Sequence, residues 1–190
     1  MGHLLATGIL SDAEAKIVAD RLVHPSMSSG FGLRTMASTA GGYSPLSYHC
    51  GSVWPHDTAI AVQGMITAGF PDHATVPAKG LLAAGAAFDA RVPELFGGFA
   101  ADDLPVPLPY PASCRPQAWA AAAAVVMLRA FLGIDPDVPN RVVRLRPSTA
   151  VGALDVSGLR IGERPFAVSV DSTGAVTSVD AALGLTCIVG

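Results

Sequence analysis

The chain has 190 residues, of which 51% are hydrophobic and 14% are charged, and its formal net charge is −3 at pH 7. This length fits one domain, or one domain with a small appendage, and it allows a buried core. Globular chains typically carry about 25% charged residues, so the low charge indicates extensive burial or an apolar surface that a partner covers. The weakly acidic balance argues against nucleic acid as a partner.

Cysteine usage and the most apolar segments bear on the cellular compartment. Three cysteines at irregular spacing do not predict a disulfide framework and fit a reducing compartment. The first ten residues lack the basic segment of a signal peptide. The most apolar run, residues 119–132, contains Arg129 and is shorter than the roughly 20 residues that a membrane span needs. We therefore expect a cytoplasmic chain without a membrane partner.

Four helices are predicted in the first two thirds of the chain. The first begins at Ser11, which has Glu14 three residues later in the spacing of a capping box. The second begins at Pro55, because proline suits the first helical position. The expected ranges are residues 11–24, 55–69, 72–89 and 116–133.

The fourth predicted helix has almost no polar face between Trp119 and Leu132. A helix that is apolar all round must be covered all round, and three other helices give it poor cover. The pattern therefore predicts that this helix needs neighbours that the chain does not contain.

After residue 139 the sequence changes to short alternating runs with turn residues between them, which predict a small antiparallel β tail. The expected strands are residues 142–146, 154–161, 166–170, 176–179 and 185–189. Two long loops, residues 26–54 and 91–114, connect the predicted helices. Loops of this length inside a compact domain are usually functional or disordered, and the aromatic and charged content of the first argues against disorder.

Three clusters at helix entries and in these loops could carry chemistry. They are YHCGSVWPHD at residues 48–57, VPELF at 92–96 and CRPQAW at 114–119. Aromatic rings pack on the C–H faces of sugars, whereas acids, amides and imidazoles pair with sugar hydroxyls. Glycoside hydrolysis needs two carboxyl groups, and Asp57 and Glu94 are the acids best placed on loops at helix ends.

Each of these residues also has a simpler interpretation, and the local sequence by itself favours that simpler interpretation. Asp57 lies where it could cap a helix or interact with its dipole, and Glu94 could be a solvated loop acid. Trp119, at helical spacing, is more often a core residue than a ligand platform. A metal site built from His49, Cys50, His56 and Asp57 matches no strong zinc spacing, and no histidine is evidently oriented on Cys50 or Cys114 as a nucleophile would require.

Four motifs follow one another in the chain: SGFGLRT at residues 29–35, YSPLSYHCGSVWPHD at 43–57, PELFG at 93–97 and CRPQAW at 114–119. In this order they resemble the last third of bacterial amylo-α-1,6-glucosidases, the glycogen-debranching type of six-hairpin glycosidase. The resemblance covers roughly residues 11–133.

The resemblance implies a mainly α fold, in which about four helices form part of an (α/α)₆ toroid and are followed by the small antiparallel β tail. Residues 1–135 would be the C-terminal part of the helical domain, and residues 136–190 would pack on it as the β tail. Since four helices cannot close a ring of twelve, the chain is expected to be a C-terminal fragment whose partner is the missing N-terminal half.

The resemblance also implies an inverting glycoside hydrolase that acts on α-glucosidic linkages of an oligosaccharide or polysaccharide, without cofactor or metal. Glu94 matches the general base of this family, whereas its general acid has no counterpart here, so the chain is expected to be incomplete alone. The residues expected to bind substrate or support the base are Arg34, Tyr48, His49, Trp54, His56, Asp57, Gln117 and Trp119.

Two alternatives remain open from the sequence. The chain could be a non-catalytic remnant or carbohydrate-binding piece that keeps the sugar-facing loops but cleaves nothing. It could also be a helical interaction domain whose apolar helix docks a partner.

Overall fold

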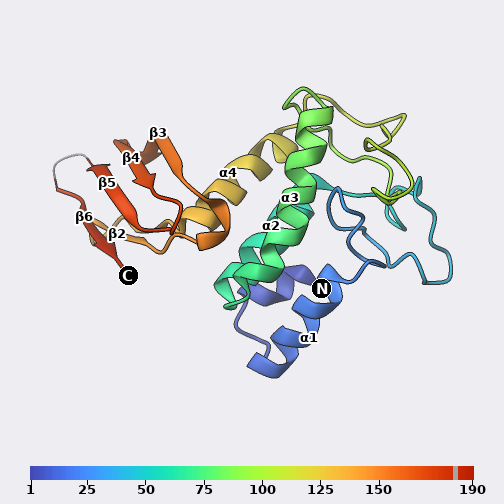
Figure 1. Cartoon of the computed structure of the whole chain (residues 1–190), viewed down its shortest axis with the longest axis horizontal. Helices are drawn as coiled ribbons and strands as arrows, with labels where there is room; N and C mark the ends of the chain where they lie inside the picture. The colour runs from blue at the N-terminus through green and yellow to red at the C-terminus, as the bar shows by residue number, and fades with distance from the viewer. Residues whose placement is uncertain (182–183) are drawn as a thin grey trace. The chain divides into compact units, whose positions relative to one another are not determined.

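A computed structural model describes residues 1–181 and 184–190 of the chain (Figure 1). The chain divides into two compact units, Met1–Met127 and Leu128–Gly190. The division lies inside the fourth helix, whereas the sequence placed the boundary at residue 135.

The predicted fold class, a mainly α partial toroid, is wrong. The described residues form four α-helices and six strands in two small sheets, which is an α+β fold with a β-rich C-terminal region. The physical reason is that the alternating segments after residue 134 build a hydrophobic core of their own, while long irregular loops take the place of further helices in the first unit.

The helices of the first unit lie close to their predicted ranges. They are the 3₁₀ helix η1 (Gly2–Ala6) and the α-helices α1 (Asp12–Val23), α2 (Pro55–Thr67), α3 (Pro71–Ala87) and α4 (Ala118–Leu132), of which α4 continues into the second unit. The capping box at the start of α1 is confirmed, because Ser11 N donates to Glu14 Oε2 at 2.9 Å and Glu14 N donates to Ser11 Oγ at 3.4 Å. The sequence did not predict η1.

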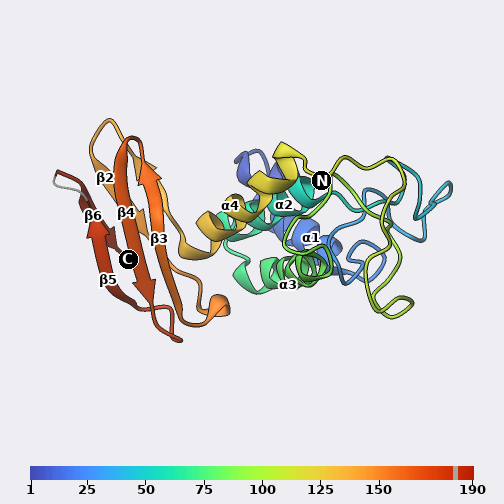
Figure 2. The same cartoon turned by 90° about the horizontal axis from the view of Figure 1, so that it is seen from above.

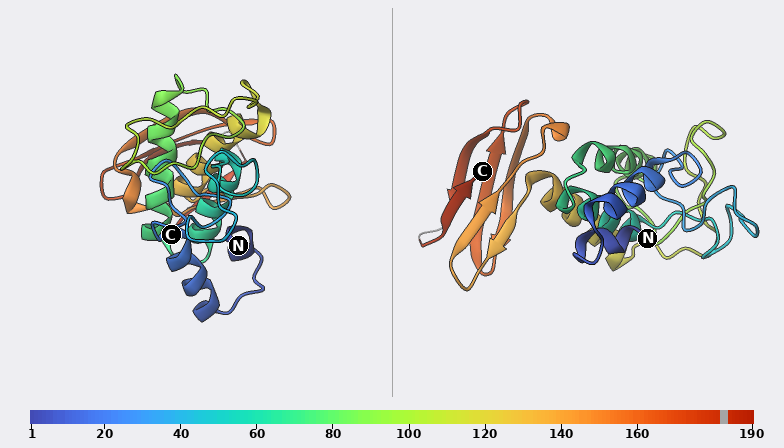
Figure 3. Two further views of the ribbon diagram at one scale, coloured as in Figure 1. Left: turned by 90° about the vertical axis from the view of Figure 1, so that its right-hand side faces the viewer. Right: turned by 90° about the horizontal axis from the view of Figure 1, so that it is seen from below.

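The helix α2 is the centre of the first unit. It packs against α3 on one side and against η1 on another (Figures 1 and 3). Small residues allow η1 to approach closely, since a Cβ on Gly2 would lie only 2.6 Å from the Cβ of Ala61, and a Cβ on Gly64 would lie 3.1 Å from the Gly2 carbonyl oxygen. This close contact brings the neighbouring His3 beside the first turn of α2.

The two long loops are tied to each other by isolated backbone bridges. Val53 pairs with Arg34 on one side and with Phe96 on the other, and Phe96 pairs in turn with Pro109. Val53 and Phe96 exchange two hydrogen bonds of 2.9 and 3.0 Å, and both side chains are fully buried. The loops before α2 and before α4 therefore lie side by side, as Figures 1 and 2 show.

The helix α4 keeps an uncovered apolar face. Trp119 is 60% exposed and Val125 is 62% exposed, although Ala120 and Ala123 on another face are buried. In the described part of the chain, no helix combines the length and the apolarity that crossing a bilayer needs.

The second unit contains two three-stranded sheets (Figure 2). Their strands are β1 (Asp135–Asp137), β2 (Val142–Leu145), β3 (Leu154–Ile161), β4 (Arg164–Val170), β5 (Val176–Ala181) and β6 (Thr186–Val189), with a short 3₁₀ turn η2 (Thr149–Val151) before β3. Buried residues of both sheets, such as Val143, Leu145, Phe166 and Val168, form one cluster with Leu132 from the end of α4.

The sequence predicted a wholly antiparallel tail, and this prediction is wrong. The sheet β3-β4-β5 is antiparallel, but β2 pairs with β6 in parallel. The five predicted strands are present, whereas β1 was missed because Pro136 interrupts its short run. A parallel pair joins segments distant in sequence, so local alternation could not predict it.

An acidic residue on α1 links α1 to α3. Asp20 accepts hydrogen bonds from Lys16 Nζ at 2.7 Å and from His73 Nε2 at 2.9 Å. The pKa of the Asp20 carboxyl is lowered from its usual 3.8, first by the hydrogen bond from Lys16 and then by the one from His73. Because the pKa is lower in the folded chain than in the unfolded chain, this stabilisation is present above pH 3.8 and is lost as the pH falls through the folded value.

We predict that Asp20→Asn lowers the urea midpoint of unfolding at pH 7, and that the difference from the unaltered chain shrinks when unfolding is repeated well below pH 3.8. Asp102→Asn, at an exposed loop aspartate, is the control and should leave the midpoint unchanged. An Asp20→Asn effect of the same size at both pH values would contradict the electrostatic explanation.

Candidate functional site

Seven of the nine residues that the sequence proposed for the site line one cavity of about 390 Å³. They are Tyr48, His49, Trp54, His56, Asp57, Glu94 and Trp119. They come from three separated segments: the end of the first loop with the first turn of α2, the second loop, and the first turn of α4. Arg34 and Gln117 do not line this cavity.

Glu94 is held at the cavity by both its backbone and its carboxylate. Its backbone N–H donates to the carbonyl oxygen of Cys114 at 3.0 Å, and the next N–H, of Leu95, donates to Ser113 Oγ at 3.2 Å. The Tyr48 hydroxyl donates to Glu94 Oε1 at 2.7 Å, and the Cys114 N–H makes a longer contact of 3.4 Å with Oε2. The second loop thus presents a half-buried carboxylate to the cavity.

The backbone of Tyr48 is bonded to its own segment, and its ring contacts both loops. The Tyr48 carbonyl oxygen accepts hydrogen bonds from Ser52 Oγ at 2.7 Å and from Trp54 Nε1 at 3.0 Å. Its ring makes edge contacts with His49, Trp54 and Tyr110, with centroids 4.6, 4.8 and 5.9 Å away. The pKa of Tyr48 is raised from its usual 10.0, first by the hydrogen bond to Glu94, then by partial burial and by the Glu94 charge.

Aromatic rings continue from Tyr48 across the floor of the cavity to α4. Trp54 is 6% exposed and contacts His56 edge to face at 5.6 Å, and His56 contacts the exposed Trp119 at 4.5 Å. His49 stacks on Trp54 at 5.6 Å with an interplanar angle of 11°. The row therefore begins beside Glu94 and ends at a solvent-exposed indole, which is an arrangement that can pack against sugar rings.

Asp57 is the second carboxylate of the cavity, and histidines contact it on both oxygens. His3 Nε2 lies 2.8 Å from Oδ1, and His56 Nε2 lies 3.5 Å from Oδ2. Asp57 occupies the first turn of α2, where a negative charge is favourable, but among the described residues its carboxylate accepts no backbone hydrogen bond. The simple capping interpretation therefore explains its place in sequence but not its contacts.

A buried nitrogen accompanies this pair. His56 Nδ1 is buried and has no hydrogen-bond partner among the described residues. An unpaired buried polar atom is costly, so the position of His56 depends on its packing between Trp54 and Trp119 and on its contact with Asp57.

Arg34 is buried and hydrogen-bonded to the backbone of the loops. Its side chain is 5% exposed and donates to three backbone carbonyl oxygens, those of Gly98 at 2.6 Å, Pro25 at 2.7 Å and Ser28 at 3.1 Å. Gly98 has no room for a side chain, because a Cβ there would overlap the Gly51 carbonyl oxygen. Arg34 therefore joins the two loops by their backbones.

Gln117 supports the start of α4. Its Oε1 accepts a hydrogen bond from the Ala120 N–H at 2.8 Å, and its carbonyl oxygen accepts one from Ala121 N–H at 3.1 Å. These bonds cap the first turn of α4 and so orient Trp119 two residues later.

Two contacts of the site residues were missed from the sequence. His3 contacts Asp57 from η1, and Tyr110, which does not itself line the cavity, contacts the Tyr48 ring from the second loop. A lone histidine near the N-terminus carries no spacing signal, and nothing local relates it to a residue 54 positions away. Tyr110 lies four residues before the CRPQAW motif, and its place in an aromatic loop was the only available signal.

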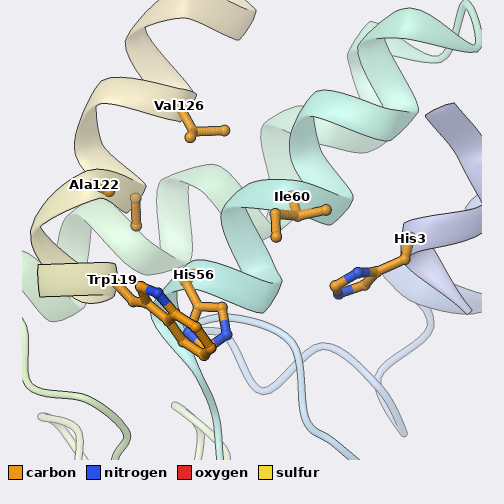
Figure 4. Close-up of a pocket in the computed structure, with 7 residues that line it drawn as sticks. His3, His56, Ile60, Trp119, Ala122 and Val126 are labelled. Carbon is orange, nitrogen blue, oxygen red and sulfur yellow. The ribbon is translucent and has the colours of Figure 1, made fainter.

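His3 also lines a second, more apolar cavity of about 300 Å³, which shares His56 and Trp119 with the first (Figure 4). Its lining residues are His3, His56, Ile60, Trp119, Ala122, Ala123 and Val126. The imidazole of His3 and the side chains of Ile60 and Val126 face this space from η1, α2 and α4. Among the described residues, no group of three or more His, Cys, Asp or Glu side chains is placed to hold a metal ion.

No protein-family model matches the chain, and a comparison with curated proteins gives no match. The resemblance to amylo-α-1,6-glucosidases therefore depends on the four motifs alone.

We predict that Arg34→Met destabilises the chain by about 3 kcal/mol, because hydrogen bonds from a charged group are lost and buried carbonyl oxygens are left unpaired. Urea unfolding followed by tryptophan fluorescence measures the change. Arg21→Met, at an exposed arginine on α1, is the matched control and should change the free energy of unfolding little. Equal midpoints for the two variants would exclude the structural role of Arg34.

We also predict that Glu94→Gln lowers the pKa of Tyr48 toward 10.0, because the hydrogen bond to the Glu94 carboxylate, and then its negative charge, no longer disfavour the phenolate. The chain has three tyrosines, so ¹³Cζ-labelled tyrosine gives three NMR titration curves, and Tyr48→Phe assigns the relevant one. Glu163→Gln is the control, since it removes a glutamate of the second unit. A Tyr48 curve unaffected by Glu94→Gln would contradict the hydrogen bond between them.

Proposed function

We propose that this chain takes part in the hydrolysis of α-glucosidic linkages in oligosaccharides or polysaccharides, with inversion at the anomeric carbon and with Glu94 as the general base. The observation that carries the proposal is the cavity in which the Glu94 carboxylate lies beside a row of aromatic rings and a second carboxylate, Asp57. The motif resemblance to glycogen-debranching enzymes supports the choice of α-glucosidic linkages.

In an inverting reaction a carboxylate removes a proton from water while the water oxygen bonds to the anomeric carbon. The bond from that carbon to the leaving-group oxygen breaks, and the electron pair leaves with that oxygen, which a general acid protonates. Glu94 suits the base role because its carboxylate is half-buried but open to the cavity. The exposed indole of Trp119 would pack against a sugar ring and hold the anomeric carbon near Glu94.

The general acid is proposed to come from another polypeptide segment. Asp57 is the other carboxyl group among the residues that line the cavity, and both of its oxygens face imidazoles. An oxygen that faces hydrogen-bond donors is suited to orient a sugar or a histidine rather than to donate a proton. The exposed apolar face of α4 around Trp119 and Val125 offers a surface to which such a segment could bind. A cytoplasmic location remains a prediction of the sequence.

The base role can be tested without the general acid by using α-D-glucosyl fluoride. Fluoride leaves without being protonated, so the base and the sugar-binding residues suffice for turnover. We expect the purified chain to hydrolyse this substrate and to release β-glucose first, as proton NMR of the fresh product would show. Glu94→Gln should lower the rate at least about 100-fold, which is the usual contribution of a general base.

Glu163→Gln is the matched control, because it removes a glutamate of the second unit and should leave turnover unchanged. Initial release of α-glucose would contradict inversion. A Glu94→Gln variant that hydrolyses glucosyl fluoride as fast as the unaltered chain would remove Glu94 from the base role.

The contacts of Asp57 favour one alternative, a carbohydrate-binding chain that cleaves nothing. Both oxygens of this carboxylate face imidazoles, so Asp57 is not evidently placed to act as the general acid. This alternative predicts that isomaltose or maltotriose binds in calorimetry and that Trp119→Ala weakens the binding, while glucosyl fluoride is not hydrolysed. Hydrolysis that depends on Glu94 would exclude it.

A further inference from the structure

We propose that Tyr48 is a positioning residue for Glu94 rather than a sugar contact, and that its hydroxyl orients the carboxylate so that Oε2 takes the proton from water. This inference rests on the proposed base role of Glu94. It assigns different tasks to the two oxygens of one carboxylate, because the structure surrounds them with different donors.

The first step of the argument is that Glu94 Oε1 is already engaged. It accepts a hydrogen bond from the Tyr48 hydroxyl at 2.7 Å, which is the usual distance for an O–H···O hydrogen bond. A hydroxyl has one hydrogen to donate, so a Tyr48 that donates to Glu94 cannot donate the same hydrogen to a sugar oxygen. The raised pKa of Tyr48 keeps this hydrogen on the phenol at neutral pH.

The second step is that Tyr48 is held near Glu94 by its backbone and by its ring. Its backbone carbonyl oxygen accepts hydrogen bonds from Ser52 and from the Trp54 indole, and its ring touches three other rings although the residue is 38% exposed. The hydroxyl thus reaches from the first loop to Glu94, which belongs to the second loop. The bridge between Val53 and Phe96 holds the two loops together close to this contact.

The third step concerns the remaining oxygen. Among the described residues, Glu94 Oε2 has a single long contact of 3.4 Å with the Cys114 N–H. A weakly bonded carboxylate oxygen keeps more of its capacity to accept a proton than one that already accepts a short hydrogen bond. In the hydrolytic step, one O–H bond of water breaks, its proton passes to Oε2, and the water oxygen bonds to the anomeric carbon as the leaving group departs with its electron pair.

The experiment compares Tyr48→Phe with Tyr110→Phe. Both substitutions remove one hydroxyl from the same aromatic cluster, but of these two hydroxyls only that of Tyr48 donates a hydrogen bond to Glu94 among the described residues. The first measurement needs no turnover. The chain has three glutamates, Glu14, Glu94 and Glu163, so ¹³Cδ-labelled glutamate gives three carboxyl signals, and Glu94→Gln assigns one of them.

We expect Tyr48→Phe to move the Glu94 carboxyl signal at pH 7, whereas Tyr110→Phe leaves it in place. With α-D-glucosyl fluoride, Tyr48→Phe should lower kcat about tenfold and leave KM nearly unchanged, because an interaction that acts through the base is felt in the transition state. Tyr110→Phe should change neither constant.

The outcomes that overturn this inference differ from those that overturn the proposed function. A Glu94 signal that Tyr48→Phe does not move, or a raised KM with unchanged kcat, would show that Tyr48 does not position the base. If the unaltered chain shows no turnover, or if turnover survives Glu94→Gln, the base role itself is contradicted. The NMR measurement then still tests the contact between Tyr48 and Glu94.

Discussion

The candidate site depends on the backbone pairing between Val53 and Phe96, which holds two long loops against each other. Both side chains are fully buried, so the pairing lies in the core of the first unit and excludes water. Tyr48 lies five residues before Val53, and Glu94 lies two residues before Phe96. A single two-hydrogen-bond contact therefore determines which side chains of the two loops meet.

Other buried groups protect this pairing. Arg34 binds the backbone of both loops, and the lack of a side chain at Gly98 lets the Gly51 carbonyl oxygen approach. Arg34 belongs to the motif at residues 29–35 and Gly51 to the motif at residues 43–57, although neither residue lines the cavity. The motifs thus combine residues that face the cavity with residues that hold the loops in place, a distinction that spacing alone cannot make.

The fold was only partly predictable. Caps and prolines located the helices well, because these signals are local: Ser11 with Glu14 begins α1, and Pro55 begins α2. The fold class was predicted wrongly, because the resemblance extended a helical architecture over a chain whose last third forms its own two-sheet core. The parallel pairing of β2 with β6 likewise joins residues more than forty positions apart, as Val143 with Cys187.

The sequence by itself determined the ranges of the helices and of five strands, and it identified seven residues that line one cavity. These features follow from local periodicity, from capping residues and from short contiguous sequence motifs. Only the tertiary structure decided that Tyr48 donates to Glu94, that His3 reaches Asp57, and that Arg34 and Gln117 bind backbone instead of facing the cavity. The physical reason is that such contacts depend on how distant loops pack, which no local pattern of residues encodes.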